Sequence, residues 1–198
     1  MLKVGITGNI GSGKTTVCKI FEQLNIPVYY ADDRAKYLMA NDATLIYEIK
    51  SLFGEAAYSA EGVLNRKLIA NAVFTQPLLL KKLNAVVHPA VARDTNIWFN
   101  EQKSDYALKE AALLVETGAY KIMDKLIVVT APNAIRKKRV MYRDNVTETD
   151  FINRDKNQMP AKEKCKLADF IIKNDEKSLL IPQVIQIHKK IMDMLHAN

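Results

Sequence analysis

A glycine-rich segment at Gly8–Thr15 constrains the fold of this chain more than any other feature. Its sequence, Gly-Asn-Ile-Gly-Ser-Gly-Lys-Thr, matches the pattern G-x-x-x-x-G-K-[ST] at every fixed position. It follows an apolar segment, residues 2–7, that predicts a buried strand, and it opens a helix expected from about Lys14 to Leu24. A phosphate-binding loop requires this order of strand, loop and helix, whereas a chance glycine turn does not.

The residue types of the loop suit a bound anion. Glycines let several backbone N–H groups approach and converge on a phosphate, and the start of the helix adds partial positive charge. Lys14 is expected to reach the β- and γ-phosphates as a catalytic residue, and the Thr15 hydroxyl to ligate Mg²⁺. The predicted triphosphate contacts in this segment are Gly11, Ser12, Gly13, Lys14, Thr15 and Thr16.

The rest of the sequence narrows the class of P-loop protein. The motifs D-x-x-G and N-K-x-D are absent, so a Ras-like GTPase would lack the means to sense the γ-phosphate and to read guanine. A chain of 198 residues is short for a motor ATPase and fits one domain with a lid or small insert. Together with a basic helix late in the chain, these features favour a small-molecule kinase.

Composition and charge bear on location and partners. The two cysteines, Cys18 and Cys165, lie far apart and predict neither a disulfide framework nor a zinc site, which fits a reducing cytoplasm. We find no secretory leader and no apolar run of membrane-spanning length, and we expect no membrane partner. The net charge of +7 suits anionic partners, either polyphosphate ligands or nucleic acid.

Short apolar segments alternate with helical patterns along the chain. Residues 106–115 have helical propensity, but a parallel sheet covered on both faces needs a strand there, and we predict a strand. Pro89 disfavours helix in the residue before it, so a helix boundary is predicted at residues 88–89. The other strands are expected at residues 28–30, 126–130 and 169–173, and the other helices at 34–39, 44–53, 64–74, 78–87, 90–102, 132–142 and 180–195.

Basic residues gather in the last third of the chain. Two readings are open for this cluster: a solvated helical face, or a surface that meets phosphates. As a like-charged group it should repel itself without an anion, and Asn145, Thr147 and Thr149 suggest flexible turns nearby. The cluster comprises Arg136, Lys137, Lys138, Arg139 and Arg143, followed by Arg154, Lys156, Lys162, Lys164 and Lys166.

Taken in order, segments over nearly the whole chain resemble the dephospho-coenzyme A kinases. Each piece is weakly specific alone, but their order and spacing are highly specific. Two departures are Tyr30, where the family usually has the first Asp of Asp-Ala-Asp, and Ala112 in place of a proline. The matching segments are the phosphate loop, Val28–Asp32, Leu83–Pro89 ending in His-Pro, Ala112–Glu116, the lid-like Lys138–Asp144, Gln158, and Ala168–Asn174.

This resemblance implies an α/β, three-layer P-loop kinase fold with a parallel sheet of about five strands flanked by helices. It implies one domain over residues 1–198, with an acceptor-side helical subdomain at about 35–102 and a lid at about 139–166. The implied reaction is ATP-dependent phosphorylation of the ribose 3′-hydroxyl of dephospho-coenzyme A, the last step of coenzyme A synthesis, with Mg²⁺. The alternatives are another nucleotide or nucleoside kinase, or a nucleic-acid-binding P-loop regulator. The expected partners are the two small-molecule substrates, with no nucleic acid, and the oligomeric state is open, a monomer being compatible.

Site residues outside the loop follow from position and from the resemblance. Asp32, at the end of a predicted strand, is the candidate that orients or deprotonates the acceptor hydroxyl, the alternative being a helix N-cap that Asp33 could also supply. Arg139 and Arg143 lie one helical turn apart and are candidate catalytic residues that neutralise the moving phosphoryl group.

The resemblance also places His88 on the acceptor side, where it packs or hydrogen-bonds substrate; the alternative is a general base. Asn174, just past the last predicted strand, is an ATP-binding candidate whose backbone or amide would meet adenine; the alternative is an ordinary turn residue. Glu110 and Glu116 are candidate partners of Mg²⁺-bound water or of the lid arginines, with no ranking between these options.

Overall fold

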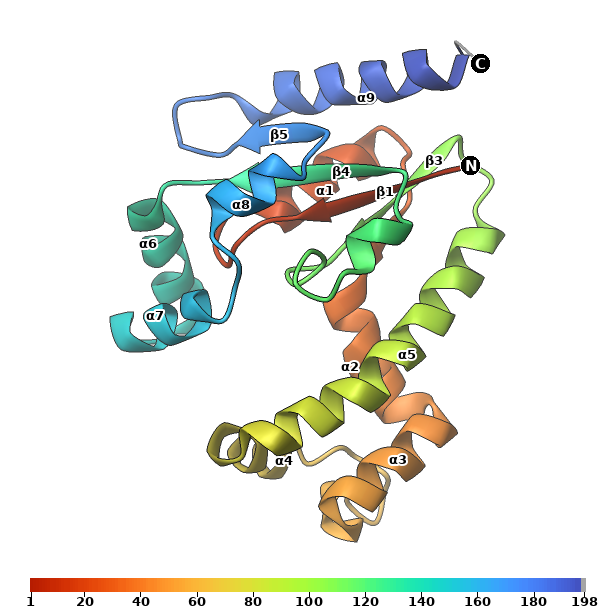
Figure 1. Ribbon diagram of the computed structural model, residues 1–198, viewed down its shortest axis with the longest axis vertical. Helices are drawn as coiled ribbons and strands as arrows, with labels where there is room; N and C mark the ends of the chain where they lie inside the picture. Colours follow the sequence, from red (N-terminus) through yellow and green to blue (C-terminus); the bar gives the residue numbers. More distant parts are fainter. Residues whose placement is uncertain (197–198) are drawn as a thin grey trace. The chain divides into compact units, whose positions relative to one another are not determined.

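The structure is a computed structural model that describes residues 1–196, apart from the side chains at positions 74 and 75 (Figure 1). It divides into two compact units. The first comprises Met1–Tyr30 and Gln102–Asn198, and the second comprises Ala31–Glu101. Within residues 1–196, no helix is long and apolar enough to span a membrane.

The first unit is built on a five-stranded sheet in the order β2-β3-β1-β4-β5, with every pairing parallel. The strands are β1 (Leu2–Thr7), β2 (Val28–Tyr30), β3 (Tyr106–Glu110), β4 (Lys125–Thr130) and β5 (Phe170–Lys173). Because the strands are parallel, all of their carboxyl ends lie at one edge of the sheet. The loop after the central β1 leaves that edge between β3 and β4, where open α/β sheets bind ligands.

Helices cover the two faces of this sheet unequally. On one face, α1 (Lys14–Gln23) and α9 (Leu180–His196) pack against alternate strand residues, forming a core that includes Val4, Ile6 and Ile127. On the other face lie α8 (Ala161–Lys166), the segment after β3 and the short helix η2 (Ala119–Ile122), around Leu114 and Leu126. The expected three-layer parallel-sheet fold is therefore confirmed.

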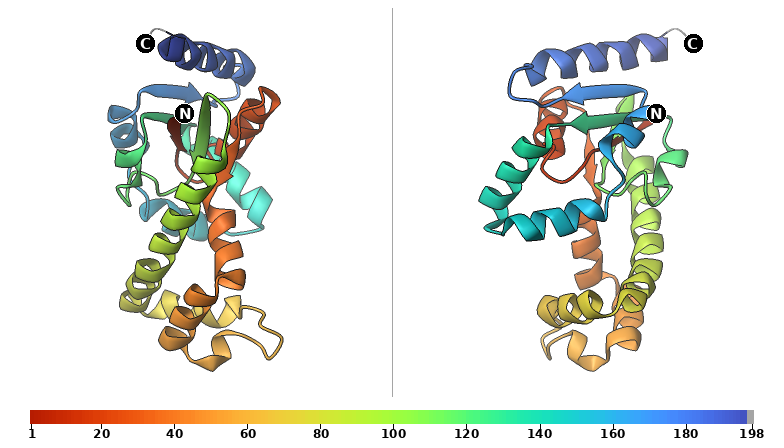
Figure 2. Two further views of the ribbon diagram at one scale, coloured as in Figure 1. Left: turned by 90° about the vertical axis from the view of Figure 1, so that its right-hand side faces the viewer. Right: turned by 60° about the vertical axis from the view of Figure 1, so that its left-hand side comes forward.

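Two more helices extend from the carboxyl edge of the sheet. These are α6 (Asn133–Asp144), which follows β4, and α7 (Glu148–Lys156), which runs back toward α8 (Figure 2). The interpretation of Thr147 as part of a flexible turn is wrong, because its hydroxyl accepts the N–H of Asp150 and the Asp150 carboxylate accepts the Thr147 N–H. This reciprocal capping box starts α7, and the spacing T-x-x-D signals it in the sequence.

The second unit is helical. Its elements are α2 (Ala31–Asn41), α3 (Ala43–Phe53), η1 (Glu55–Ala57), α4 (Arg66–Thr75) and α5 (Pro77–Glu101). The helices share a core of their own that includes Leu45, Ile49 and Leu83. An Arg34–Asp94 ion pair, with Nε donating to Oδ2 over 2.9 Å, joins α2 to α5.

The predicted helix boundary at residues 88–89 is wrong, because α5 continues through Pro89. Proline in a helix interior removes one backbone hydrogen bond and costs about 3 kcal/mol. The buried residues Leu83, Val87 and Ala90 keep helical spacing across the proline and enter the same core. Beyond the proline the same helix also buries Thr95 and Phe99. Burial of a large apolar side chain such as Phe99 contributes about 1.5–3 kcal/mol, which offsets the lost bond.

The strand predicted over residues 106–115 is shorter than expected and ends at Glu110. Beyond it the chain leaves the sheet, and Leu114 and Val115 turn into the smaller core beside Leu126. The Cβ that an alanine would place at Gly5 would lie 2.6 Å from Leu114 Cδ2, so the missing side chain on β1 makes room for this segment. Tertiary packing thus overrides both the helical propensity and the continued strand.

Candidate active site

The phosphate loop runs from the end of β1 to the start of α1. Gly13 is the N-cap of α1 with φ 91°, and Gly11 has φ 78°, both in the left-handed region that favours glycine. A Cβ at Gly11 would lie 2.6 Å from the carbonyl oxygen of Arg136, and one at Gly13 would collide with the side-chain amide of Asn174. The loop therefore owes its tight path to backbone dihedrals and to neighbours that leave no space for side chains.

Groups suited to an anion gather at this loop. The first turn of α1 starts at Lys14, so its N–H groups have no partner within the helix and are available to a ligand. Ser12 is fully buried, and its hydroxyl has no hydrogen-bond partner among the described residues. Thr15 and Thr16 are exposed at the helix start. An orphaned buried hydroxyl within a glycine cradle is what a phosphate-binding loop provides.

Lys14 lies folded back over the loop. Its Nζ donates to the carbonyl oxygen of Gly8 over 3.0 Å and lies 3.8 Å from Oε1 of Glu110. The two side chains are only 10% and 8% exposed, so this charge pair is largely desolvated and its attraction is stronger than that of a surface pair. The ammonium group is thus held at the carboxyl edge of the sheet, beside the loop.

Glu110 stands next to the unusual Tyr30. The two are register partners on β3 and β2, so their side chains project from the same face of the sheet. The Tyr30 hydroxyl donates to Oε1 of Glu22 on α1 over 3.1 Å, and burial, followed by nearby negative charge, raises the pKa of this phenol. Tyr30 therefore stays protonated and directed at α1, and the carboxylate at this edge comes from the neighbouring strand.

Lys109 and Glu110 are consecutive residues of β3, so their side chains project from opposite faces of the sheet. The Lys109 ammonium lies 5.8 Å from the centre of the Tyr29 ring, and burial lowers the pKa of this amine.

The acceptor-side candidates Asp32 and His88 lie in the helical unit, on α2 and α5 respectively. Asp32 follows β2 after one residue and lies in the first turn of α2, because the helix starts at Ala31. Its side chain is exposed, and among the described residues it makes no recorded ion pair or hydrogen bond. Asp33 instead pairs with Lys36 at 2.7 Å, so the two neighbouring carboxylates differ in what they contact.

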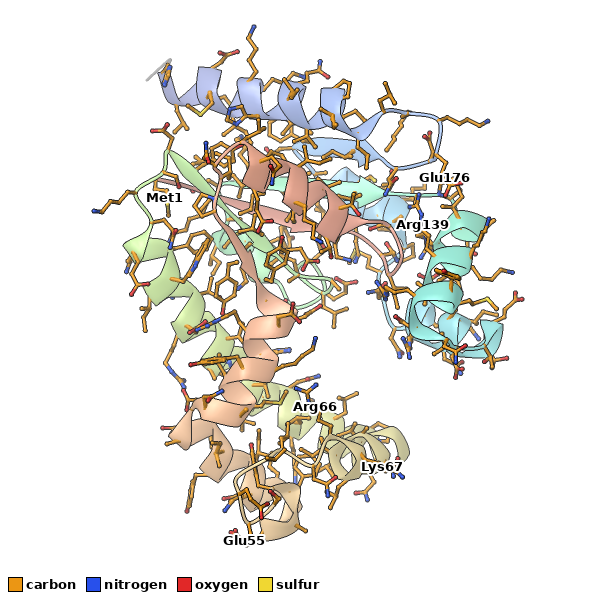
Figure 3. The ribbon with its side chains drawn as sticks, turned by 180° about the vertical axis from the view of Figure 1, so that it is seen from behind. Met1, Glu55, Arg66, Lys67, Arg139 and Glu176 are labelled. Carbon is orange, nitrogen blue, oxygen red and sulfur yellow. The ribbon has the colours of Figure 1, made fainter. Side chains whose placement is uncertain are left out.

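The basic cluster on α6 does not repel itself as expected, because each of four cations has a carboxylate partner. Arg136 is buried, which contradicts a wholly solvated face. Arg139 lies 3.3 Å from Glu176 on the loop after β5, and Figure 3 shows these two side chains facing one another. The four pairs are Arg136–Asp155, Lys137–Glu148, Arg139–Glu176 and Arg143–Asp144.

Asp144 also receives a second arginine. Its carboxylate accepts from Arg143 Nε over 2.7 Å and from Arg154 Nη1 over 2.8 Å, which ties the end of α6 to α7. The hydrogen bond from Arg143 holds the pKa of Asp144 below its ordinary value. Arg143 is nevertheless 64% exposed and remains reachable by a ligand.

Asn174 bonds the loop and Arg139 at the same time. Its Nδ2 donates to the Ser12 carbonyl oxygen over 2.8 Å, and its Oδ1 accepts from Nη2 of Arg139 over 3.2 Å. Its own N–H donates to the Thr130 carbonyl oxygen over 2.8 Å. The expected contact of its amide with adenine would compete with these bonds, so the structure gives Asn174 a supporting place between Ser12 and Arg139.

Glu116 bonds groups on α8 and in the segment before it. Its Oε1 is 2.8 Å from Nζ of Lys164, and it accepts the N–H of Met159 over 2.8 Å. Lys164 is fully buried and donates to the Ala112 carbonyl oxygen over 3.1 Å. This buried pair anchors α8 to the segment after β3, and no local sequence signal marks it, because the partners lie 48 positions apart.

The fold and the site define a P-loop kinase: a parallel sheet whose central strand ends in a phosphate loop, with arginine-bearing helices at the same edge. Comparison with known proteins makes the assignment specific. The dephospho-CoA kinase family model matches residues 2–179. The dephospho-CoA kinase of Bacteroides fragilis is 34% identical over 196 residues, covering 98% of this chain and 95% of its own length. The chain belongs to the dephospho-CoA kinase family.

Solved structures agree with this family. The crystal structure of TT1252 from Thermus thermophilus superposes with a TM-score of 0.83 at 32% identity, covering 98% of this chain and 97% of that one. A dephospho-CoA kinase from Campylobacter jejuni gives a TM-score of 0.69 at 28% identity, with 96% of both chains covered. The reaction of the family is the ATP-dependent, Mg²⁺-dependent phosphorylation of dephospho-CoA, which completes coenzyme A.

The geometry around Gly13 leads to a first prediction. Gly13→Ala should weaken ATP binding at least about tenfold, because a left-handed alanine costs about 1–2 kcal/mol and its Cβ would displace the Asn174 amide. Gly118→Ala is the matched control, since Gly118 has φ 74° but open space around its Cβ. ATP affinity and thermal unfolding of both variants check this. Equal ATP affinities in the two variants would show that the Asn174 contact has no bearing on the loop.

Proposed function

We propose that this chain phosphorylates the ribose 3′-hydroxyl of dephospho-coenzyme A with ATP through the loop at Gly8–Thr15, in the cytoplasm and without a nucleic-acid or membrane partner. The observation that carries the proposal is the desolvated Lys14–Glu110 pair at the end of β1, beside a glycine cradle with an orphaned Ser12 hydroxyl. Membership of the family supplies the acceptor.

Each residue of the loop has a role in this proposal. Backbone N–H groups from Gly11 to Thr16 bind the β- and γ-phosphates, and Lys14 exchanges the Gly8 carbonyl for a phosphate oxygen. The Thr15 hydroxyl is the assigned protein ligand of Mg²⁺, with the Glu110 carboxylate as a nearby acceptor for metal-bound water, since Mg²⁺ prefers oxygen ligands and keeps several waters. When bound, Mg²⁺ neutralises charge on the phosphate oxygens.

The acceptor side is assigned to the helical unit. Asp32 orients the 3′-hydroxyl and takes its proton, a role open to an exposed carboxylate without a competing partner among the described residues. His88 contributes to binding the acceptor. In-line phosphoryl transfer is mostly a matter of positioning, so these groups act by fixing the hydroxyl rather than by forming covalent intermediates.

We assign the lid role to α6 and α7, which carry Arg139, Arg143 and Arg154. In the proposal these arginines bind the triphosphate, either in place of their carboxylate partners or in addition to them. Closure of the lid also excludes water, which otherwise competes with the acceptor hydroxyl. This assignment starts the lid earlier than the expected 139–166, at Asn133, and ends it earlier, at Lys156. It leaves out Lys164, which is fully buried and paired with Glu116.

Arg139→Ala should lower kcat about 10³-fold, with a much smaller change in KM for dephospho-coenzyme A. A well-placed arginine is worth about this factor or more in phosphoryl transfer, and Asn174 already holds Arg139 beside the loop. Lys138→Ala is the control, since Lys138 is exposed on the same helix. Steady-state kinetics with each substrate varied measures both parameters. Activity of Arg139→Ala within about threefold of the Lys138→Ala variant would remove Arg139 from the mechanism.

The acceptor is tested by a coupled ADP-release assay with dephospho-coenzyme A, AMP, CMP and adenosine in parallel. We expect dephospho-coenzyme A to have the highest kcat/KM by a wide margin. Higher kcat/KM with a nucleotide or nucleoside would instead identify another nucleotide or nucleoside kinase.

A further inference from the structure

The backbone of one residue of the phosphate loop, Ile10, is bonded at both its N–H and its carbonyl oxygen by residues far along the chain. The Ile10 N–H donates to Oε1 of Gln158 over 2.8 Å, and the Ile10 carbonyl oxygen accepts from Nη1 of Arg136 over 3.2 Å. Arg136 lies on α6 and Gln158 in the segment after α7, so both regions contact the loop at Ile10. Because its N–H is engaged by Gln158, Ile10 is not a phosphate donor in this arrangement, and its two backbone bonds fix the path of the loop.

The neighbouring loop residue is held by the same segment. Asn9 Nδ2 donates to the Met159 carbonyl oxygen over 3.1 Å and lies 3.5 Å from Oδ1 of Asp155. Met159 is itself held through its N–H by Glu116. The base of the α6–α7 pair is therefore attached to the loop at two consecutive residues.

Arg136 connects these contacts to each other. Its Nη1 lies 2.6 Å from Asp155 Oδ1 and its Nη2 lies 3.1 Å from Oδ2, a two-bond arrangement that fixes the guanidinium plane. The Arg136 guanidinium also lies over the Phe151 ring, with 5.6 Å between its central carbon and the ring centre. The side chains of Arg136 and Asp155 are 8% and 21% exposed. Nη1 of Arg136 donates both to Asp155 on α7 and to the Ile10 carbonyl oxygen of the loop. A shift of α7 relative to α6 would therefore displace the group that bonds Ile10.

Arg136 also lies one helical turn before Arg139, whose guanidinium reaches Asn174 on the other side of the loop. The loop is thus bounded by two arginines of one helix, and only Arg139 remains partly exposed. Because both arginines lie on α6, the contacts that fix the position of Arg136 also fix the position of Arg139.

We propose that Arg136 and Asp155 are positioning residues that hold the backbone at Ile10 through its carbonyl oxygen, so that the other loop N–H groups converge on the phosphates while Arg139 is kept beside them. This inference rests on the proposed phosphotransfer function and deepens it. Arg136 does not touch the nucleotide; it acts through the loop and through α6. The proposal gives members of the basic cluster different roles. Arg136 holds the loop backbone, whereas Arg139 and Arg143 are assigned to the triphosphate.

The decisive variant is Arg136→Met/Asp155→Leu. Removing one partner alone would leave a largely buried charge unpaired and endanger folding, whereas replacing both with apolar side chains of similar size is usually tolerated. The matched control is Lys137→Met/Glu148→Leu, which removes another α6–α7 ion pair, at 2.7 Å, whose side chains do not bond the loop. Arg136→Lys with native Asp155 keeps the charge but cannot form both bonds to the carboxylate and the bond to Ile10.

We expect the Arg136→Met/Asp155→Leu variant to lose about 10–100-fold in kcat and to bind ADP more weakly, with KM for dephospho-coenzyme A unchanged, because displacement of about 1 Å can cost 10²-fold. Hydrogen exchange should show that a non-hydrolysable ATP analogue protects residues 8–13 less than in the unmodified protein. The control should keep kcat within about twofold, and Arg136→Lys should fall between.

A folded Arg136→Met/Asp155→Leu variant with unchanged kcat, ADP affinity and loop protection would overturn the proposal. An equal loss in the Lys137→Met/Glu148→Leu control would overturn it as well, since the effect would then belong to helix packing in general. The ADP-binding and hydrogen-exchange measurements do not use the acceptor. If the unmodified protein failed to phosphorylate dephospho-coenzyme A, they would still decide the role of Arg136.

Discussion

Lys14→Ala should abolish phosphoryl transfer, lowering kcat by at least about 10³-fold while leaving the fold intact. In the structure the ammonium group is largely desolvated between the Gly8 carbonyl and the Glu110 carboxylate, beside the glycine loop. A cation fixed in a water-poor site stabilises developing charge far better than one in bulk water. Alanine leaves nothing in its place.

The control for this substitution is Lys19→Ala, which removes an exposed lysine from the same helix. Single-turnover ADP release measures transfer, and circular dichroism with thermal unfolding measures the fold. We expect some loss of stability in Lys14→Ala, because Glu110 is only 8% exposed and loses a partner. Activity close to that of Lys19→Ala in a folded Lys14→Ala protein would contradict the assignment of the phosphate loop.

Asp32→Asn should lower kcat about 10²–10³-fold with KM for ATP nearly unchanged. The substitution keeps the shape of the side chain but removes the charge that accepts or orients the proton of the hydroxyl, and general bases contribute about 10²–10⁴-fold. ATP binding should persist because the loop residues from Gly11 to Thr16 are untouched.

Asp33→Asn is the matched control for this prediction, because it removes the neighbouring carboxylate. Asp33 is the next residue of the same helix turn, yet its carboxylate pairs with Lys36. We expect this variant to lose less than about threefold in kcat. Steady-state kinetics with both substrates varied tests the pair. If kcat fell little in Asp32→Asn but strongly in Asp33→Asn, the acceptor-side carboxylate would be Asp33 and not Asp32.

Local sequence signals predict the phosphate loop, the strand and helix on either side of it, and the sheet that carries them. The strand at Leu2–Thr7, the loop and the helix from Lys14 follow from apolar spacing and glycine placement, and the parallel sheet follows from strands alternating with helices. These features are local because backbone hydrogen bonding and side-chain periodicity act over a few residues. The boundary at Pro89 failed because packing of α5 on both sides of the proline outweighs one lost hydrogen bond.

The charged network around the loop could not be predicted in the same way. Arg136 with Asp155 and Glu116 with Lys164 join residues 19 and 48 positions apart, and each reads as an ordinary surface charge in isolation. Glu110 is similar, because its place beside Lys14 depends on β3 lying next to β1. Propensity and periodicity report which side chains are buried in each element, but not which element lies beside it.

The position of the new phosphate on the product tests the central claim most directly. Dephospho-coenzyme A is incubated with ATP and Mg²⁺, and the product is examined by two-dimensional ¹H–³¹P correlation spectroscopy. We predict one new phosphomonoester signal that correlates with the ribose H3′ proton, formed in equal amount with ADP and absent with Lys14→Ala. A new phosphate that correlates with H2′, or ADP formation without any new phosphomonoester, would contradict the account.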